Sequence, residues 1–209
     1  MIQSWYVQYG CGLRAPPGWR NFDASPTLRI QRLPLAGRLF RRNPYPEFPP
    51  NVEYGDIVKG LPLPEAFCVG LYCSHVLEHL SLSDFRLALR NSYRLLIAGG
   101  VFRLVVPDLE FLVQSYLSTA GQTGCINFME QTGLGRMTRS RGIAGFLREW
   151  IGNSGHLWMW DFKGLAAELK DAGFRGIRRA RPGDSADFRF LDVEDSRRWE
   201  NCLGVECVR

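Results

Sequence analysis

The most constraining feature of the sequence is a near-continuous apolar run at residues 67–74, Phe-Cys-Val-Gly-Leu-Tyr-Cys-Ser. A strand with apolar side chains on both faces is typical of the centre of a parallel sheet, because helices cover both sides of such a sheet. The next segment, 85–96, repeats apolar residues at helical spacing. We expect the glycine pair at 99–100 to end that helix and residues 101–106 to form the following strand.

Five further segments complete the predicted sheet. Their aromatic and β-branched residues predict strands at residues 4–9, 21–23, 52–57, 174–181 and 202–208. A helix over residues 161–172 precedes the last two strands, which have no helix between them and therefore predict a terminal antiparallel hairpin. The fold class is thus α/β: a Rossmann-like, doubly wound, mostly parallel sheet of about seven strands.

The length of 209 residues predicts a single domain over residues 1–209. Its regular pattern weakens over residues 109–155, where we expect an insertion that caps the substrate site, with helical pieces to residue 117 and at 143–151. Residues 13–19 are too short and too rich in proline for the usual first crossover helix. Residues 28–50 contain five prolines, and we expect only a short helix there, at about 30–40.

Charge and cysteine usage exclude several classes of protein. The net charge of +5 is only mildly basic, and the basic stretches at 38–42 and 136–141 are more typical of solvated loops than of a nucleic-acid footprint. The six cysteines show no spacing of a zinc site. No apolar stretch approaches the roughly 20 residues of a membrane span. We therefore expect a cytoplasmic protein with free thiols and no nucleic-acid partner.

Polar and small residues follow the first three strands, at the sheet edge where such folds bind ligands. Gly10 and Gly12 permit a tight turn and close approach of a ligand to the backbone. The Asp23 carboxylate can accept both hydroxyls of a ribose, and Asp56 can accept from an amine such as that of adenine. Each feature alone is equally compatible with an ordinary turn. Together, without a lysine-bearing phosphate loop, they favour a nucleoside cofactor that has no triphosphate.

These segments resemble the class I S-adenosylmethionine (SAM)-dependent methyltransferases, in particular the methyltransferase type 11 group. The resemblance rests on the glycine motif Tyr9-Gly10-Cys11-Gly12, the ribose-binding strand end Asn21-Phe22-Asp23, the acidic motif Gly55-Asp56-Ile57, the segment Leu61-Pro62-Leu63-Pro64, the fourth-strand signature Cys73-Ser74-His75-Val76-Leu77-Glu78-His79-Leu80 and the segment Arg94-Leu95-Leu96-Ile97-Ala98-Gly99-Gly100. Gln8, where many members carry an acidic residue, and the missing crossover helix depart from the family pattern.

The resemblance implies that the chain is an enzyme, and it implies a set of site residues. The cofactor would be SAM, held by Tyr9, Gly10, Cys11, Gly12, Asp23, Asp56, Ile57, Ser74 and His75. Candidate catalytic residues are His75, His79 and His156, although His79 is equally compatible with a core or capping position. The methyl acceptor would be a small molecule, a sugar or a lipid-linked intermediate. The two departures leave open a binding protein on the same fold that does not catalyse methyl transfer.

Residues 75–79 also spell the motif HxxEH, which on a helix would bind zinc for a hydrolase. Here the motif directly follows a buried strand, and no third ligand stands out further along the sequence. We therefore predict no metal site from the sequence.

Overall fold

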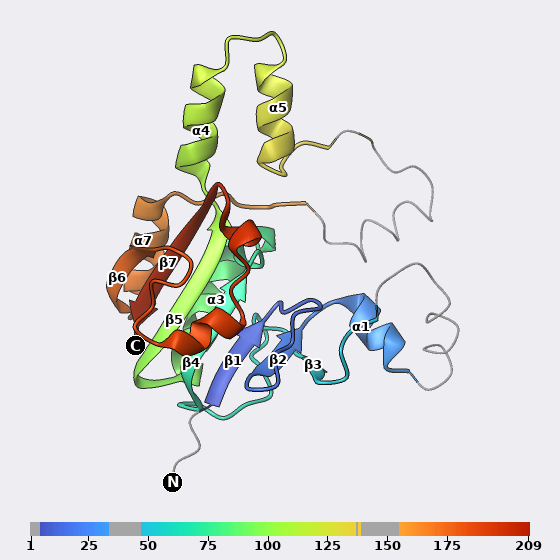
Figure 1. The fold of residues 1–209 in the computed structure, drawn as a ribbon, viewed down its shortest axis with the longest axis vertical. Coiled ribbons are helices and arrows are strands. Elements are labelled where there is room, and N and C mark those ends of the chain that lie inside the picture. The colour runs from blue at the N-terminus through green and yellow to red at the C-terminus, as the bar shows by residue number, and fades with distance from the viewer. Residues whose placement is uncertain (1–4, 34–46, 137, 139–154) are drawn as a thin grey trace.

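A seven-stranded sheet forms the centre of the fold in the computed structural model, which describes residues 5–33, 47–136, 138 and 155–209 (Figure 1). The strands are β1 Trp5–Tyr9, β2 Arg20–Asp23, β3 Val52–Tyr54, β4 Cys68–Ser74, β5 Leu96–Pro107, β6 Arg175–Ala180 and β7 Cys202–Val208. Their order in the sheet is β3-β2-β1-β4-β5-β7-β6. β7 runs antiparallel to both of its neighbours, and the other pairings are parallel. The predicted fold class and the terminal antiparallel hairpin are confirmed.

The position of β1 determines where a ligand can bind. β1 pairs with β2 on one side and with β4 on the other, so the chain reverses its direction of travel across the sheet at this point. In parallel sheets this reversal leaves a crevice beyond the carboxyl ends of the strands, because the connections diverge to opposite sides. The ends of β1, β2 and β4 therefore frame the candidate site.

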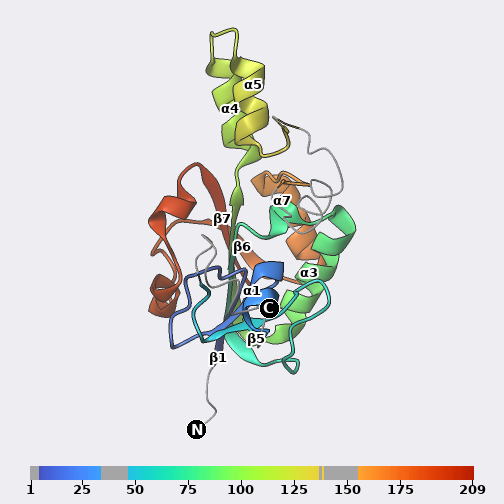
Figure 2. The ribbon, with the colours of Figure 1, turned by 90° about the vertical axis from the view of Figure 1, so that its right-hand side faces the viewer.

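Helices cover one face of the sheet, and an irregular segment covers part of the other (Figure 2). α3 Leu82–Leu95 and α7 Phe162–Asp171 lie on the first face, where Phe85 and Leu165 are fully buried in the main core. Ser81 caps α3 by accepting from the backbone N–H of Asp84. The segment 181–201, which contains the short 3-10 helices η2 Phe188–Asp192 and η3 Ser196–Trp199, packs on the second face.

Arg103 anchors the segment 181–201 to the sheet. Its side chain is fully buried on β5 and lies against the rings of Phe190 and Trp199. Its guanidinium donates to Glu194 at 2.5 Å and to Glu206 at 2.6 Å. A buried arginine is stable only when carboxylates and hydrogen bonds compensate its desolvation, so this network fixes the position of the irregular segment.

The junction of α3 and β5 differs from the sequence prediction. The helix ends at Leu95 rather than at the glycine pair, and β5 already begins at Leu96. The backbone N–H of Phe67 donates to the carbonyl of Leu95, so strand pairing takes over directly from the helix and no left-handed cap is needed. Gly99 has a φ of 79° and lies in an irregularity of β5, where the register with β4 shifts.

Two other boundaries also move. β3 ends at Tyr54 rather than at residue 57, because Asp56 begins a turn in which its carbonyl accepts from Lys59. The expected helix at about 30–40 is instead α1 Pro26–Gln31, which begins earlier because Ser25 caps it and a proline occupies its first position. The rest of that predicted range, from residue 34, lies outside the described residues, as does the predicted helical piece at 143–151.

The inserted region contains a helical hairpin that stands away from the sheet, beyond the end of β5 (Figure 1). α4 Leu109–Ser118 confirms the predicted helical piece, and α5 Gly124–Gln131 was not predicted because glycine and threonine border this short helix. No helix in the described part of the chain is both long and apolar enough to cross a membrane.

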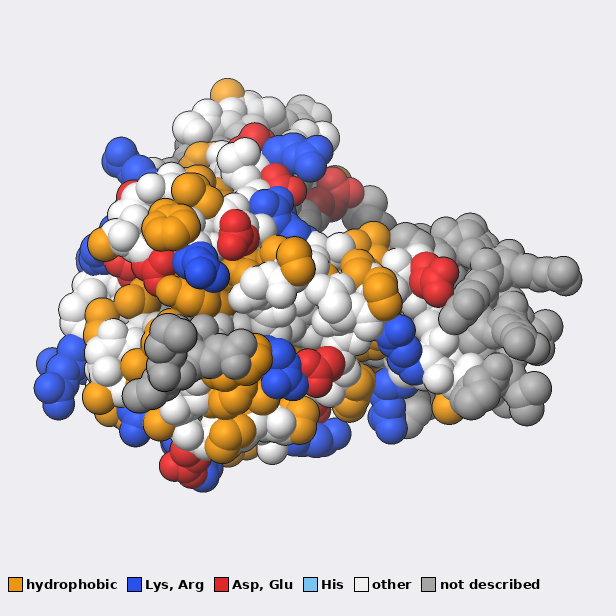
Figure 3. Space-filling view, turned by 60° about the horizontal axis from the view of Figure 1, so that its bottom comes forward, with side chains coloured by type: hydrophobic (Ala, Val, Ile, Leu, Met, Phe, Trp, Pro, Cys, Tyr) orange, Lys and Arg blue, Asp and Glu red, His pale blue; other side chains and the backbone are white. Residues whose placement is uncertain are grey.

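Figure 3 shows the face from which β1 starts, where Lys and Arg side chains are spread among acidic and hydrophobic ones.

Candidate cofactor site

A cavity of about 430 Å³ opens beyond the carboxyl ends of the strands. Its lining includes Gly10 after β1, Asp23 at the end of β2, Asp56 after β3 and His75 after β4. The parallel order of these strands brings the four residues to one edge of the sheet. A volume of a few hundred Å³ is typical of small-molecule and cofactor sites. The polar strand ends therefore converge on one cavity.

Gly10 is required by the geometry of the turn after β1. Its φ is 65°, a left-handed conformation that disfavours residues with a Cβ atom. A Cβ at this position would lie 2.1 Å from Cγ2 of Val76, another residue that lines the cavity. Glycine at position 10 therefore allows the Val76 side chain to pack directly against the backbone at the cavity.

Asp23 closes a turn and also lines the cavity. Its Oδ1 accepts from the backbone N–H of Ser25 at 2.8 Å, which closes an Asx turn, and its Oδ2 accepts from the N–H of Gly12 at 2.9 Å. Each carboxylate oxygen can accept a second hydrogen bond. The carboxylate is therefore held in place by the backbone and keeps acceptor capacity toward the cavity.

Asp56, after the neighbouring strand β3, is held in a similar way. Its Oδ1 accepts from the N–H of Val58 at 3.0 Å, and its Oδ2 lies 3.4 Å from the Nζ of Lys59. The lysine side chain is mostly exposed, so this ion pair is weak and leaves the carboxylate available to a ligand.

The structure divides the predicted cofactor residues between two cavities. Tyr9 and Ile57 join the cavity described above. Cys11 and Ser74 instead line a second cavity of about 300 Å³, which shares only Tyr9 and Gly10 with the first. Gly12 lines neither cavity, and its role is the hydrogen bond to Asp23.

The placement of Ser74 follows from strand geometry. Alternate side chains of a strand point to opposite faces, and Ser74 shares its face with Tyr72, which packs in the core beneath the segment 181–201. Arg198 of that segment donates to the carbonyl oxygen of Ser74 at 2.9 Å.

Burial, with a contribution from the charge of Asp23, raises the pKa of Cys11 to about 12, so its thiol is neutral at physiological pH.

Gln8 has a role that was not predicted. Its Nε2 donates to the carbonyl of Arg14 at 2.7 Å and to Oδ1 of Asn21 at 2.6 Å. Residues 10–19 contain no helix, in agreement with the sequence prediction, and this amide fastens them to the sheet. In the sequence, this role was indicated by an amide side chain at a position where many members of the resembled family carry an acidic residue.

The HxxEH motif does not lie on one helix. His75 has a φ of 56°, and the short 3-10 helix η1 Leu77–His79 begins only after it. The Nδ1 of His75 is 2.9 Å from Oγ of Ser74, and its Nε2 is 3.5 Å from Sγ of Cys202. Burial, together with the charge of Arg198, lowers the pKa of His75 to about 4, so this imidazole is neutral at pH 7.

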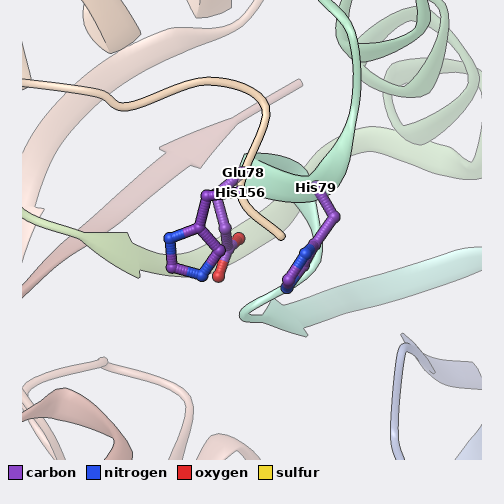
Figure 4. A group of neighbouring side chains, drawn as sticks. All are labelled: Glu78, His79 and His156. Atoms are coloured by element: carbon purple, nitrogen blue, oxygen red, sulfur yellow. The ribbon is translucent and has the colours of Figure 1, made fainter. Parts of the chain in front are cut away.

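His79 and His156 lie next to each other, with ring centroids 4.9 Å apart (Figure 4). The Nδ1 of His79 is 3.1 Å from the carbonyl oxygen of Gly155, and the Nδ1 of His156 is 2.7 Å from that of Thr132. The N–H groups of Leu157 and its successor donate to the carbonyl of Glu78. The region around His156 is thus fastened to η1, although only His79 lines the larger cavity.

Glu78 lies beside these two rings (Figure 4). Its side chain is 0% exposed, and neither carboxylate oxygen has a hydrogen-bond partner among the described residues. Burial raises the pKa of this carboxyl group to about 7, against the smaller, opposing effect of the charge of Arg198. An unpartnered buried carboxyl group is unfavourable, and its position therefore needs an explanation.

The two tryptophans after His156 have different environments. Trp160 is 5% exposed and stacks on Phe85 with ring centroids 4.2 Å apart, as expected of a core residue. Trp158 is 41% exposed and is available to a ligand or to solvent.

Comparison with known proteins finds one family match and several similar folds. Residues 30–104 match the methyltransferase domain family of type 11. No curated protein matches the sequence.

The fold is similar to those of several solved methyltransferase structures. A SAM-dependent methyltransferase from Thermotoga maritima has a TM-score of 0.52 and 12% identity, over 98% of this chain and 81% of that one. One from Archaeoglobus fulgidus has a TM-score of 0.50 and 14% identity, over 99% and 86%. PigF, solved with S-adenosylhomocysteine (SAH), has a TM-score of 0.51 and 14% identity, over 98% of this chain and 50% of its own. The chain therefore has the fold of these solved SAM-dependent methyltransferases, and its residues 30–104 are similar to the methyltransferase domain family.

Proposed function

We propose that the chain binds SAM in the cavity of about 430 Å³ and transfers its methyl group to a small-molecule, sugar or lipid-linked acceptor. The observation that carries the proposal is the convergence of Gly10, Asp23 and Asp56 on that cavity. The likeness to PigF, which was solved with SAH, supports the same cofactor.

The residues present fit an adenosyl group. Asp23 would accept from the ribose hydroxyls, because its two oxygens retain acceptor capacity after binding the backbone. Asp56 would accept from the adenine amine. Gly10 allows the ligand to approach the backbone without meeting a Cβ atom. When bound, SAM supplies an electrophilic methyl group, and the protein chiefly has to orient the acceptor toward it.

Two histidines would face the acceptor. His75 and His79 line the cavity on the side of η1. His75 would help to position the acceptor rather than deprotonate it, because a pKa of about 4 makes its imidazole a weak base. The hairpin of α4 and α5 would cap this end of the site, since the turn after α5 binds His156 through the carbonyl of Thr132.

Calorimetric titration with SAM and SAH tests the cofactor assignment. We expect the wild-type chain to bind both, and Asp23→Ala to weaken SAM binding by about 1–3 kcal/mol, or roughly 5- to 150-fold in Kd. Asp161→Ala is the matched control, because Asp161 also accepts from a backbone N–H but caps α7 away from the cavity. Equal affinities of the two variants, or no binding by the wild type, would refute the proposal.

A binding protein without catalysis is the second candidate, favoured by the absence of a helix in residues 10–19. Mass detection of SAH formed during incubation with pooled candidate acceptors separates the two. Binding of SAM without SAH formation in any pool would favour the second candidate.

A further inference from the structure

We propose that Glu78, His79 and His156 bind one divalent transition-metal ion at the acceptor end of the cavity. One ligand atom from each of the three side chains lies within 4.8 Å of the other two. Figure 4 shows the carboxylate and the two rings close together, the rings coming from η1 and from the irregular segment that carries His156. The sequence pointed to no metal because His156 is remote from the HxxEH motif and gives no spacing signal.

Hydrogen bonds to backbone carbonyls fix the tautomer of both imidazoles. A carbonyl oxygen can only accept, so the Nδ1 atoms of His79 and His156 must carry the protons that they donate to Gly155 and Thr132. In the neutral tautomer that these hydrogen bonds select, each ring has its lone pair on Nε2. Metal-binding histidines are commonly fixed in this way, with the second ring nitrogen donating to a backbone carbonyl.

Glu78 supplies the charge that such a site needs. Its carboxylate is completely buried, and no described residue donates a hydrogen bond to it. Burying a carboxylate without a partner is strongly unfavourable unless a cation or hydrogen bonds compensate it. A divalent ion between Glu78 and the two rings would provide that compensation.

Gly133 indicates that the position of His156 is closely determined. A Cβ at residue 133 would lie 2.6 Å from Nδ1 of His156, and the carbonyl of Gly133 accepts from the His156 N–H at 3.1 Å. The backbone of the turn after α5 therefore closes directly against the imidazole. Only a residue without a side chain allows this approach.

The ligand set selects the kind of metal. Two imidazoles and one carboxylate suit Zn²⁺, Fe²⁺ or Co²⁺, whereas Mg²⁺ prefers an octahedral shell of oxygen atoms. Three protein ligands leave coordination positions open. His79 lines the cavity, so an open position would face the space proposed for the acceptor. This last step rests on the proposed function and implies an acceptor with a hydroxyl or other oxygen donor.

Titration of the metal-free protein with Co²⁺, followed by its visible absorption, tests the site directly. We expect one Co²⁺ per chain, displaced by Zn²⁺ and not by Mg²⁺. His156→Ala and Glu78→Gln should each weaken Co²⁺ binding by more than about 100-fold, the upper range for loss of an outer-shell partner. Circular dichroism establishes that each variant folds, and His79→Gln provides a third variant if one does not.

His75→Ala is the matched control, since the chain has 3 histidines and His75 is the one outside the cluster. We expect His75→Ala to keep the stoichiometry and affinity for Co²⁺. If HxxEH itself bound the metal, His75→Ala would lose Co²⁺ and His156→Ala would retain it, and this result would overturn the proposal. Failure of the wild type to bind Co²⁺ would also overturn it. Because Co²⁺ binding is measured without SAM, its failure is distinguishable from failure of the proposed function, which the SAM titration reports.

Discussion

Alanine substitution at Gly10 should destabilise the protein much more than the same change at Gly12. Both glycines have a positive φ, 65° and 54°, so each substitution carries the left-handed penalty of roughly 1–2 kcal/mol. Only at Gly10 does the new Cβ meet another atom, Cγ2 of Val76 at 2.1 Å, whereas nothing lies within 4 Å at Gly12. Overpacking of this kind costs about 1–3 kcal/mol more. We therefore expect a loss of about 1 kcal/mol for Gly12→Ala and about 2–4 kcal/mol for Gly10→Ala, after the stiffer unfolded chain offsets part of each penalty.

The cause of the difference can be isolated with a third substitution. Val76→Ala removes the Cγ2 atom, and the next closest atom of that side chain, its Cβ, would lie at 3.5 Å from the new methyl group. The double variant Gly10→Ala/Val76→Ala should therefore be more stable than the sum of the single changes predicts, by about 1–3 kcal/mol. Urea unfolding followed by circular dichroism gives the four free energies, and SAM titration of the same samples shows whether the cavity wall has moved.

Two results would refute the reasoning. One is equal destabilisation by Gly10→Ala and Gly12→Ala, which would mean that Val76 yields without cost. The other is additivity of Gly10→Ala and Val76→Ala, which would mean that the contact at 2.1 Å does not determine the stability of the turn.

Two further predictions concern the network beneath the segment 181–201. Arg103→Met should lower the free energy of unfolding by about 3–5 kcal/mol, because it leaves the buried Glu194 without its cation. The control Arg178→Met removes a half-exposed partner of Asp184 and should lower the free energy of unfolding by less than about 1 kcal/mol. Equal losses for the two variants in urea unfolding would contradict this prediction. Although burial raises the pKa of Asp184, hydrogen bonds from Arg178 and from a backbone N–H hold it at about 2, below its usual value of 3.8. The contribution of Asp184 to stability is therefore present above about pH 4 and lost as the pH falls toward about 2. Thermal unfolding of Asp184→Asn between about pH 5 and 2, limits set by this shift, should show a smaller loss of stability than the wild type. An unchanged pH dependence would show that Asp184 does not contribute in this way.

The sequence predicted the sheet well because its strands differ strongly from their surroundings. The apolar run of β4, and the pair β6 and β7 with no α-helix between them, have few alternatives in such a sheet. Its strand ends also predicted the cavity, since parallel strands must bring Asp23 and Asp56 to the same edge. What was predicted correctly depends on periodicity and on strand direction, and both are local properties of the chain.

The remaining differences have non-local causes. The side on which Ser74 lies depends on the register of β4 and on the segment 181–201, which is distant in the sequence. The end of α3 depends on the backbone of Phe67, which binds the last helical carbonyl and begins the strand pairing. The neighbourhood of His79 and His156 depends on the inserted region folding back onto η1. No pattern of neighbouring residues reports such contacts.

The loop between β1 and β2 should differ from the sheet in local stability. Residues 10–19 lack the repeated hydrogen bonds of a helix and are held by a few contacts, among them those of the Gln8 amide. Local opening of such a segment requires much less free energy than global unfolding. Its amide hydrogens should therefore exchange with solvent while the central strands stay protected.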